Sequence, residues 1–159
     1  MLVAVQVSVC GPRECTEREW DHAYETGRLL AGRGAVVICG GYGGVMAAVA
    51  AGAGSAGGVV VGILSAADRS AAGPDLTVTL PTGLGQARNA LIVNAADAVI
   101  VVGGSWGTLS ELALAMRRGR VPVVQLGGWR VVDEEGRPPG GVLHAADPAE
   151  ALRLTGLWE

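Results

Sequence analysis

The sequence predicts an α/β domain with a doubly wound, mostly parallel, Rossmann-like sheet and helices on both faces. Short Val-rich runs that are apolar at every position recur along the 159 residues, and such runs are typical of strands buried on both faces. Helical patterns separate them, which favours a parallel sheet with right-handed crossovers. Glycine-rich turns follow several of the runs, as expected where parallel strands end at a ligand crevice. We therefore expect residues 1–159 to form a single domain.

The first half of the chain contains three strand patterns and two helical ones. Strands are expected at residues 2–9, 35–39 and 59–64, which are rich in Val and Ile. A capping box at Thr16-Glu17-Arg18-Glu19 begins the first helix, because the Thr hydroxyl and the Glu carboxylate can satisfy its first free amides. That helix is expected to end near residues 32–34. A second helix, of small residues, is expected over 45–57, and the polar residues 65–74 predict a loop.

The second half continues the alternation. Strands are expected at 77–80, 98–102 and 121–126, and helices at 85–96, with Arg88 in its first turns, and at 109–118. Residues 129–142 differ, because two apolar ends flank Asp133-Glu134-Glu135-Gly136-Arg137; this pattern predicts a β-hairpin or an ordered flap. Asp147 as cap and Pro148 at the first helical position begin a final short helix.

Charge and composition exclude several classes of protein. The net charge of −3 favours neither a nucleic-acid groove nor an anionic membrane surface. All 12 basic residues are Arg, so a Walker-type phosphate loop lacks its lysine and a pyridoxal phosphate Schiff base cannot form. No secretory signal fits the start of the chain, and no apolar stretch reaches about 20 residues. We therefore expect a cytoplasmic protein without a membrane span.

Metal and dinucleotide sites are not expected either. The three cysteines and two histidines have no metal-ligand spacing (Cys10, Cys15 and Cys39; His22 and His144). Cys10 and Cys39 each end an apolar run and are expected to be small buried hydrophobes. The dinucleotide fingerprint is missing, because the first strand leads into Cys10-Gly11-Pro12-Arg13 and the second ends in Cys39 instead of an acidic residue. NAD is therefore not an expected ligand.

Two glycine-rich turns form the candidate ligand site, one at residues 40–44 and one at 103–107. Glycine lets the backbone approach a phosphate closely, and the free amides and dipole of a following helix favour its negative charge. Both turns follow parallel strands, whose carboxyl ends line the crevice of such sheets. We therefore expect them to hold a phosphate-bearing ligand. The expected ligand-binding residues are Gly40, Gly41, Gly43, Gly44, Met46, Gly103, Gly104, Ser105, Trp106, Gly107 and Thr108.

Two charged residues near these turns have two interpretations each. Thr108-Leu109-Ser110-Glu111 has the spacing of a capping box, so Glu111 either reaches back to the helix start or faces a bound sugar. Arg88 is either a solvated helix residue or a fork for a phosphate or carboxylate. The position of Arg88 just after the loop at residues 81–85 favours the second interpretation, a guanidinium that binds a phosphate or carboxylate.

These motifs together resemble the Lonely Guy family, whose members were long labelled lysine decarboxylases. The resemblance rests on Gly40-Gly41-Tyr42-Gly43-Gly44-Val45-Met46, on Arg88 and on residues 103–111, and it covers nearly the whole chain up to about residue 126. Residues 82–89, Thr-Gly-Leu-Gly-Gln-Ala-Arg-Asn, and the short chain are closer to the branch that contains the molybdenum cofactor carrier protein. The decarboxylase label does not fit, because the chain has no lysine for pyridoxal phosphate.

The resemblance implies a Rossmann-like nucleotide-binding domain, a homodimer or homotetramer, and ligands with a phosphate and a ribose or pterin. The family's enzymes are phosphoribohydrolases, which cleave the N-glycosidic bond of nucleoside 5′-monophosphates to a free base and ribose 5-phosphate. Arg88 and Glu111 match their catalytic residues. Arg88 would orient the substrate, and Glu111 would stabilise the oxocarbenium-like sugar or position water. Such hydrolysis requires no cofactor, and the expected bound molecule is a nucleoside monophosphate or a molybdopterin-type ligand.

The same residues leave a second activity class open. The enzymes' motif begins Pro-Gly-Gly, where this chain has Gly103-Gly104-Ser105, and the His and Lys that flank the family's Arg are replaced by Gln86 or Ala87 and by Asn89. The binding branch of the family also keeps the Arg and the Glu. The alternative to a hydrolase is therefore a non-catalytic molybdenum cofactor carrier or a nucleotide-sensing module.

Overall fold

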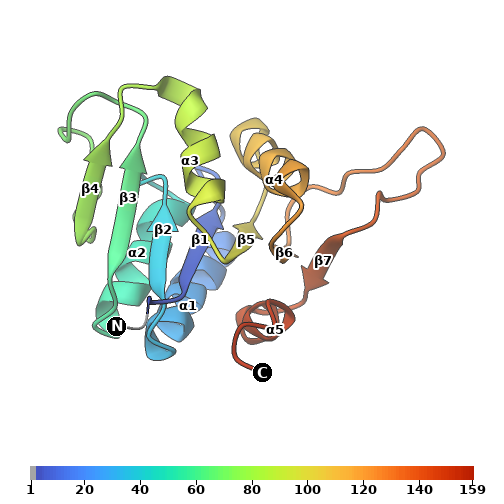
Figure 1. Ribbon diagram of the computed structural model, residues 1–159, viewed down its shortest axis with the longest axis horizontal. Coiled ribbons are helices and arrows are strands. Elements are labelled where there is room, and N and C mark those ends of the chain that lie inside the picture. The colour runs from blue at the N-terminus through green and yellow to red at the C-terminus, as the bar shows by residue number, and fades with distance from the viewer. Residues whose placement is uncertain (1–2) are drawn as a thin grey trace.

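Seven parallel strands form one sheet in the computed structural model, which describes residues 3–159 (Figure 1). The strands are β1 (Gln6–Cys10), β2 (Val36–Cys39), β3 (Val60–Leu64), β4 (Val78–Pro81), β5 (Ala98–Val102), β6 (Val123–Leu126) and β7 (Val142–Ala145). Their order in the sheet is β4-β3-β2-β1-β5-β6-β7. The chain winds outward from β1 to β4, returns to the other side of β1 as β5, and winds outward again to β7. This is the predicted doubly wound topology, and its switch point lies between β1 and β5.

Helices cover both faces of the sheet, as predicted (Figure 1). They are α1 (Glu17–Gly32), α2 (Val45–Ser55), α3 (Arg88–Asn94), α4 (Trp106–Arg118) and α5 (Pro148–Leu154). A short 3-10 turn, η1 (Gly85–Ala87), directly precedes α3. Helices α1, α2 and α5 share one buried cluster with the sheet, and α3 and α4 share the other. Among residues 3–159, no helix is long and apolar enough to cross a bilayer.

The strands are apolar at every position because each faces two helical layers. In β5, Ile100 and Val102 pack toward the α1–α2–α5 side, while Val99 and Val101 pack toward α3 and α4. All four side chains are at most 1% exposed. Alternate side chains of a strand point to opposite faces, so a strand that lies between two helical layers needs no polar face.

Small residues let α1 and α2 pack closely. A Cβ atom at Gly52 of α2 would collide with the carbonyl oxygen of Tyr24 in α1. A Cβ atom at Gly27 of α1 would likewise collide with the carbonyl oxygen of Val49. Both glycines lie inside helices, where glycine is normally unfavourable. Close backbone contact explains why this sequence keeps them.

Local signals located most elements correctly. The Thr16–Glu19 capping box forms as predicted, with both reciprocal hydrogen bonds present. Asp147 caps α5 and Pro148 occupies its first turn, also as predicted. The first strand begins at Gln6, four residues later than expected, and residue 2 lies outside the described residues. Helix α4 begins at Trp106, three residues before the expected start, because Ser105 caps it.

Of the two structures predicted over residues 129–142, the β-hairpin is wrong, whereas no observation contradicts an ordered flap. Residues 127–141 contain no helix or strand, and hydrogen bonds between Asp133 and Arg137 hold a tight turn in their middle. Figure 1 shows the segment extending away from the sheet. Pro138 and Pro139 donate no backbone hydrogen bond, which prevents a regular ladder there. Val142, expected as the end of a hairpin, instead begins β7, which pairs in parallel with β6.

Candidate functional site

A cavity of about 300 Å³ lies at the carboxyl ends of the strands. The loops after β1, β2 and β3 border it on one side, and α3 and the start of α4 border it on the other. Small-molecule sites span roughly 300 to 1,000 Å³, and in open α/β sheets they lie beside the switch point. The lining residues are Gly11, Pro12, Arg13, Tyr42, Met46, Ser65, Gly85, Gln86, Arg88, Asn89, Ser105, Gly107, Thr108 and Glu111.

The N-terminus of α4 faces this cavity. Ser105 is its N-cap, and the Ser105 hydroxyl accepts a hydrogen bond of 3.1 Å from the Thr108 amide. The first backbone bond within the helix runs from the Leu109 amide to the Ser105 carbonyl, at 2.8 Å. The amides of Trp106 and Gly107 come before it, so the helix does not use them. Together with the helix dipole they favour an anion.

Arg88 is held in one orientation beside this helix end. Its Nη1 donates to the carbonyl oxygens of Gly40, at 2.7 Å, and Ile63, at 2.6 Å, where β2 and β3 end. Its Nε donates to Oδ1 of Asn89 at 2.9 Å. The interpretation of Arg88 as a solvated helix residue is therefore wrong. Within residues 3–159 no acceptor contacts Nη2, which leaves that nitrogen available to a ligand.

Two guanidinium groups lie close to the ring of Tyr42. The Arg13 guanidinium carbon is 5.1 Å from the ring centre and that of Arg88 is 5.6 Å from it, both within cation–π range. The Tyr42 hydroxyl accepts a hydrogen bond of 3.1 Å from the Ala66 amide and contacts the Ser65 hydroxyl at 3.3 Å. Burial raises the pKa of Tyr42, but the hydrogen bonds and the Arg88 charge outweigh it and lower the pKa overall. The cavity wall is thus polar and electropositive.

Glu111 is a buried carboxyl group that borders the same cavity. It is the sixth residue of α4 and only 7% exposed. Its pKa is raised to about 7, chiefly by burial, although the Arg88 charge and the Cys10 thiol partly offset this. In the described part of the chain, no N–H or O–H group donates to it. The capping-box interpretation of Glu111 is wrong, because Ser105 caps the helix and Glu111 lies more than a turn inside it.

The predicted site residues divide into two groups. Met46, Arg88, Ser105, Gly107, Thr108 and Glu111 border the cavity. The remaining ones lie outside its lining: Gly40, Gly41, Gly43, Gly44, Gly103, Gly104 and Trp106. The structure thus brings Arg88 and Glu111 together with the start of α4.

Several of the outlying glycines allow close backbone packing around the site. A Cβ atom at Gly40 would lie 2.8 Å from Nη1 of Arg88. Gly44 has a φ of +62° and packs against the carbonyl oxygens of Pro12 and Arg13. Trp106 is not part of the cavity lining: it is 78% exposed and packs edge-on against Trp129, with ring centres 5.0 Å apart.

Sequence reasoning missed five polar or aromatic lining residues, namely Arg13, Tyr42, Ser65, Gln86 and Asn89. The sequence nevertheless held a signal for each of them. Arg13 and Ser65 follow β1 and β3, so the rule that ligands bind at the carboxyl ends of strands applies to them as well. Tyr42 lies inside the first glycine-rich turn. Gln86 and Asn89 lie within residues 82–89, the motif that resembles the cofactor carrier branch.

The thiols near the site are buried structural groups. Burial raises the pKa of Cys10 well above its usual value, with Glu111 adding to the effect, and raises the pKa of Cys39 to about 11. Thiols with such raised pKa values are poor nucleophiles and metal ligands at neutral pH. Within residues 3–159, no group of three or more His, Cys, Asp or Glu side chains is arranged to hold a metal ion.

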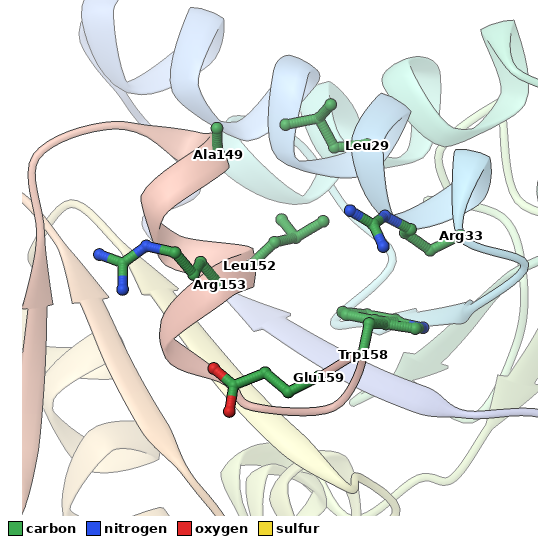
Figure 2. A pocket seen from close by; sticks show the side chains of 7 residues that line it. All are labelled: Leu29, Arg33, Ala149, Leu152, Arg153, Trp158 and Glu159. Atoms are coloured by element: carbon green, nitrogen blue, oxygen red, sulfur yellow. The ribbon is translucent and has the colours of Figure 1, made fainter.

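A second cavity, of about 270 Å³, lies between the end of α1 and α5 (Figure 2). Leu29 and Leu152 lie between the two helices, and the Arg33 guanidinium lies over the Trp158 ring at 5.9 Å. Because α1 leads into β2, this cavity lies toward the amino ends of the strands. None of the predicted site residues borders it.

Comparison with known proteins identifies the family of the chain. Residues 4–152 match the SLOG cluster4 family. An uncharacterized protein of Archaeoglobus fulgidus is 42% identical over 134 residues, covering 81% of this chain and 88% of its own.

Two solved structures are similar over almost their whole length. The molybdenum cofactor binding protein of the phototrophic bacterium Rippkaea orientalis has a TM-score of 0.87 and 31% identity, and the match covers 97% of this chain and 96% of that one. The molybdenum cofactor carrier protein of Chlamydomonas reinhardtii has a TM-score of 0.81 and 30% identity, with 95% of each chain covered. These matches support the branch to which residues 82–89 pointed, whereas the Lonely Guy identity itself stays a resemblance.

Proposed function

The chain belongs to the SLOG cluster4 family, and we propose that it is a non-catalytic carrier of a molybdenum-cofactor-type ligand, a phosphate-bearing pterin. The observation that carries the proposal is the joint placement of Arg88, Arg13 and the free N-terminus of α4 around one cavity. The similarity to two molybdenum cofactor proteins supports the pterin class of ligand.

The charge distribution fits an anionic ligand. The chain as a whole is acidic, with a net charge of −3, yet Arg13 and Arg88 both border this cavity. The phosphate of the ligand would bind at the start of α4, where the amides of Trp106 and Gly107 have no partner within the helix and Ser105 supplies a hydroxyl. Nη2 of Arg88 would contact the same anion. The molybdenum atom would arrive and leave with the ligand, as cargo.

Hydrolysis of nucleoside 5′-monophosphates is the second candidate, and one observation favours it. The pKa of Glu111 is raised to about 7, and a carboxyl group that titrates near neutral pH is suited to general acid–base catalysis. The comparisons do not support hydrolysis, because the similar solved structures are described as cofactor-binding and carrier proteins. We therefore place it second.

The two candidates are separated by a pair of measurements on the purified protein. In the first, molybdenum cofactor is titrated anaerobically and the fluorescence of the tryptophans is followed. We expect saturable binding that Arg88→Ala weakens at least tenfold, because it removes a charge-assisted contact. Arg117→Ala, an exposed arginine at the far end of α4, is the matched control and should bind as the wild type does.

In the second measurement, the protein is incubated with AMP, CMP and GMP, and free base is assayed by chromatography. The carrier proposal expects no release above a protein-free blank. Base release that Glu111→Ala abolishes would overturn the carrier proposal and establish the hydrolase. Failure of the wild type to bind the cofactor, together with no base release, would refute both.

A further inference from the structure

A chain of hydrogen bonds joins α3 to the start of α4 beside the cavity. Nε of Arg88 donates to Oδ1 of Asn89 at 2.9 Å. Nδ2 of Asn89 donates to Oγ of Ser110 at 3.0 Å. The Ser110 hydroxyl in turn donates to the carbonyl oxygen of Gly107 at 2.9 Å. The chain therefore begins at the arginine of the site and ends in the first turn of α4.

The middle of this hydrogen-bond chain requires a side chain that can donate and accept at the same time. Asn89 accepts through its oxygen and donates through its nitrogen at the same time. A carboxylate cannot donate, and an apolar side chain can do neither. Asn89 is 6% exposed, so its polar atoms depend on these two partners and water replaces them poorly.

The contact between Arg88 and Asn89 is unusual for its position. Neighbouring residues on a helix normally point in different directions, so the Arg88 side chain must fold back for Nε to reach Asn89. Two backbone carbonyls hold Nη1, and Asn89 holds Nε. A planar guanidinium fixed at two nitrogens has a defined plane, and its third nitrogen then points in one direction.

The far end of this hydrogen-bond chain contacts the first turn of α4, where we place the anion. Ser110 bonds back to the carbonyl of the residue three positions earlier, a pattern that competes with regular helix bonding and adjusts the local turn. The carbonyl concerned belongs to Gly107, which borders the cavity. Asn89 thus connects the two groups to which we assign the anion.

We propose that Asn89 and Ser110 are positioning residues that fix the Arg88 guanidinium relative to the first turn of α4. The guanidinium and the first turn of α4 can then bind the same anionic group of the ligand. This inference rests on the proposed function. It adds Asn89 and Ser110 to the site. These two residues act on the ligand through Arg88 and Gly107, which they contact.

The test is a double-mutant cycle with molybdenum cofactor as the titrant. Asn89→Leu, of similar volume, should raise the Kd about tenfold in the wild-type background, because Arg88 loses its orientation. In the Arg88→Lys background the same change should have almost no further effect, since a lysine ammonium has no Nε to orient. Asn94→Leu, at an exposed asparagine that ends α3, is the matched control and should leave the Kd unchanged.

Each result decides the inference separately from the proposed function. A wild-type protein that does not bind the cofactor refutes the function. If the wild type binds the cofactor and Asn89→Leu binds it equally well, only the positioning role is refuted. The same holds if the increases in Kd caused by Asn89→Leu and by Arg88→Lys simply multiply in the double variant. Ser110→Ala removes a single hydroxyl and serves if Asn89→Leu does not fold. It should raise the Kd several-fold, again only when Arg88 is present, and an effect of the same size in the Arg88→Lys background would overturn the inference.

Discussion

The buried Glu111 carboxyl should make the protein less stable as the pH rises. The pKa of Glu111 is about 7 in the folded protein, against an ordinary value of 4.5, chiefly because burial disfavours the charged form. Below pH 4.5 the group is protonated in both the folded and the unfolded state and costs nothing. As the pH rises from 4.5 to 7, Glu111 ionises in the unfolded chain first, which stabilises the unfolded state relative to the folded one. Above pH 7 the full loss of folding stability is present.

The size of this effect follows from the two pKa values. Each unit of difference corresponds to about 1.4 kcal/mol, so Glu111 lowers the free energy of unfolding by about 3 kcal/mol at pH 8. The cost is about 1 kcal/mol at pH 5. Glu111→Gln keeps the shape of the side chain and removes its charge. The variant should therefore be more stable than the wild type at pH 8, by an amount that shrinks as the pH falls.

Urea unfolding of the ligand-free protein between pH 5 and pH 8.5 measures this difference directly. Glu14→Gln, at an exposed glutamate in the loop after β1, is the control and should show no comparable trend. A difference between Glu111→Gln and the wild type that stays constant over this range would refute the argument that burial of the Glu111 carboxyl is the cause. A natural protein that retains such a cost indicates a role for the carboxyl group in the site.

Three further changes test the site and its scaffold. Arg88→Lys should weaken cofactor binding about tenfold, because an ammonium group cannot replace the contacts that the guanidinium makes through its three nitrogens. Fluorescence titration measures the Kd, and an unchanged Kd would contradict the assignment of Arg88 to the site. Gly52→Ala should lower the free energy of unfolding in urea by about 2 kcal/mol or more, because its Cβ would collide with the Tyr24 carbonyl; a stabilised variant would show that α1 and α2 are not in close contact. Thr16→Ala removes the α1 cap and should cost about 1 kcal/mol in the same assay, and no loss would mean that the capping box contributes nothing.

The features that the sequence predicted correctly depend on local signals. The Thr16 capping box and the Asp147 cap with Pro148 involve residues within four positions of one another, so their patterns are readable without the fold. The apolar strands were equally readable, because burial on two faces leaves a continuous Val-rich run. The doubly wound topology then followed from the alternation of strands and helices and the handedness of their connections.

The features that were missed depend on contacts between distant parts of the chain. β7 is short and its middle residues are exposed, so only its pairing with β6 makes it a strand. The fixed orientation of Arg88 arises from carbonyl oxygens 48 and 25 positions away. The burial of Glu111 beside Cys10 depends on the packing of α4 onto the sheet, whereas the spacing of Glu111 from Thr108 had indicated a cap. Each of these required the three-dimensional structure.

The decisive experiment for the carrier proposal is a crystal structure of the protein with molybdenum cofactor bound. We predict that the ligand phosphate lies at the start of α4, within hydrogen-bond distance of the Gly107 amide and Nη2 of Arg88, with the pterin in the cavity at the carboxyl ends of the strands. A ligand bound elsewhere, for instance in the cavity between α1 and α5, would contradict the account, as would a phosphate that contacts neither Arg88 nor the first turn of α4.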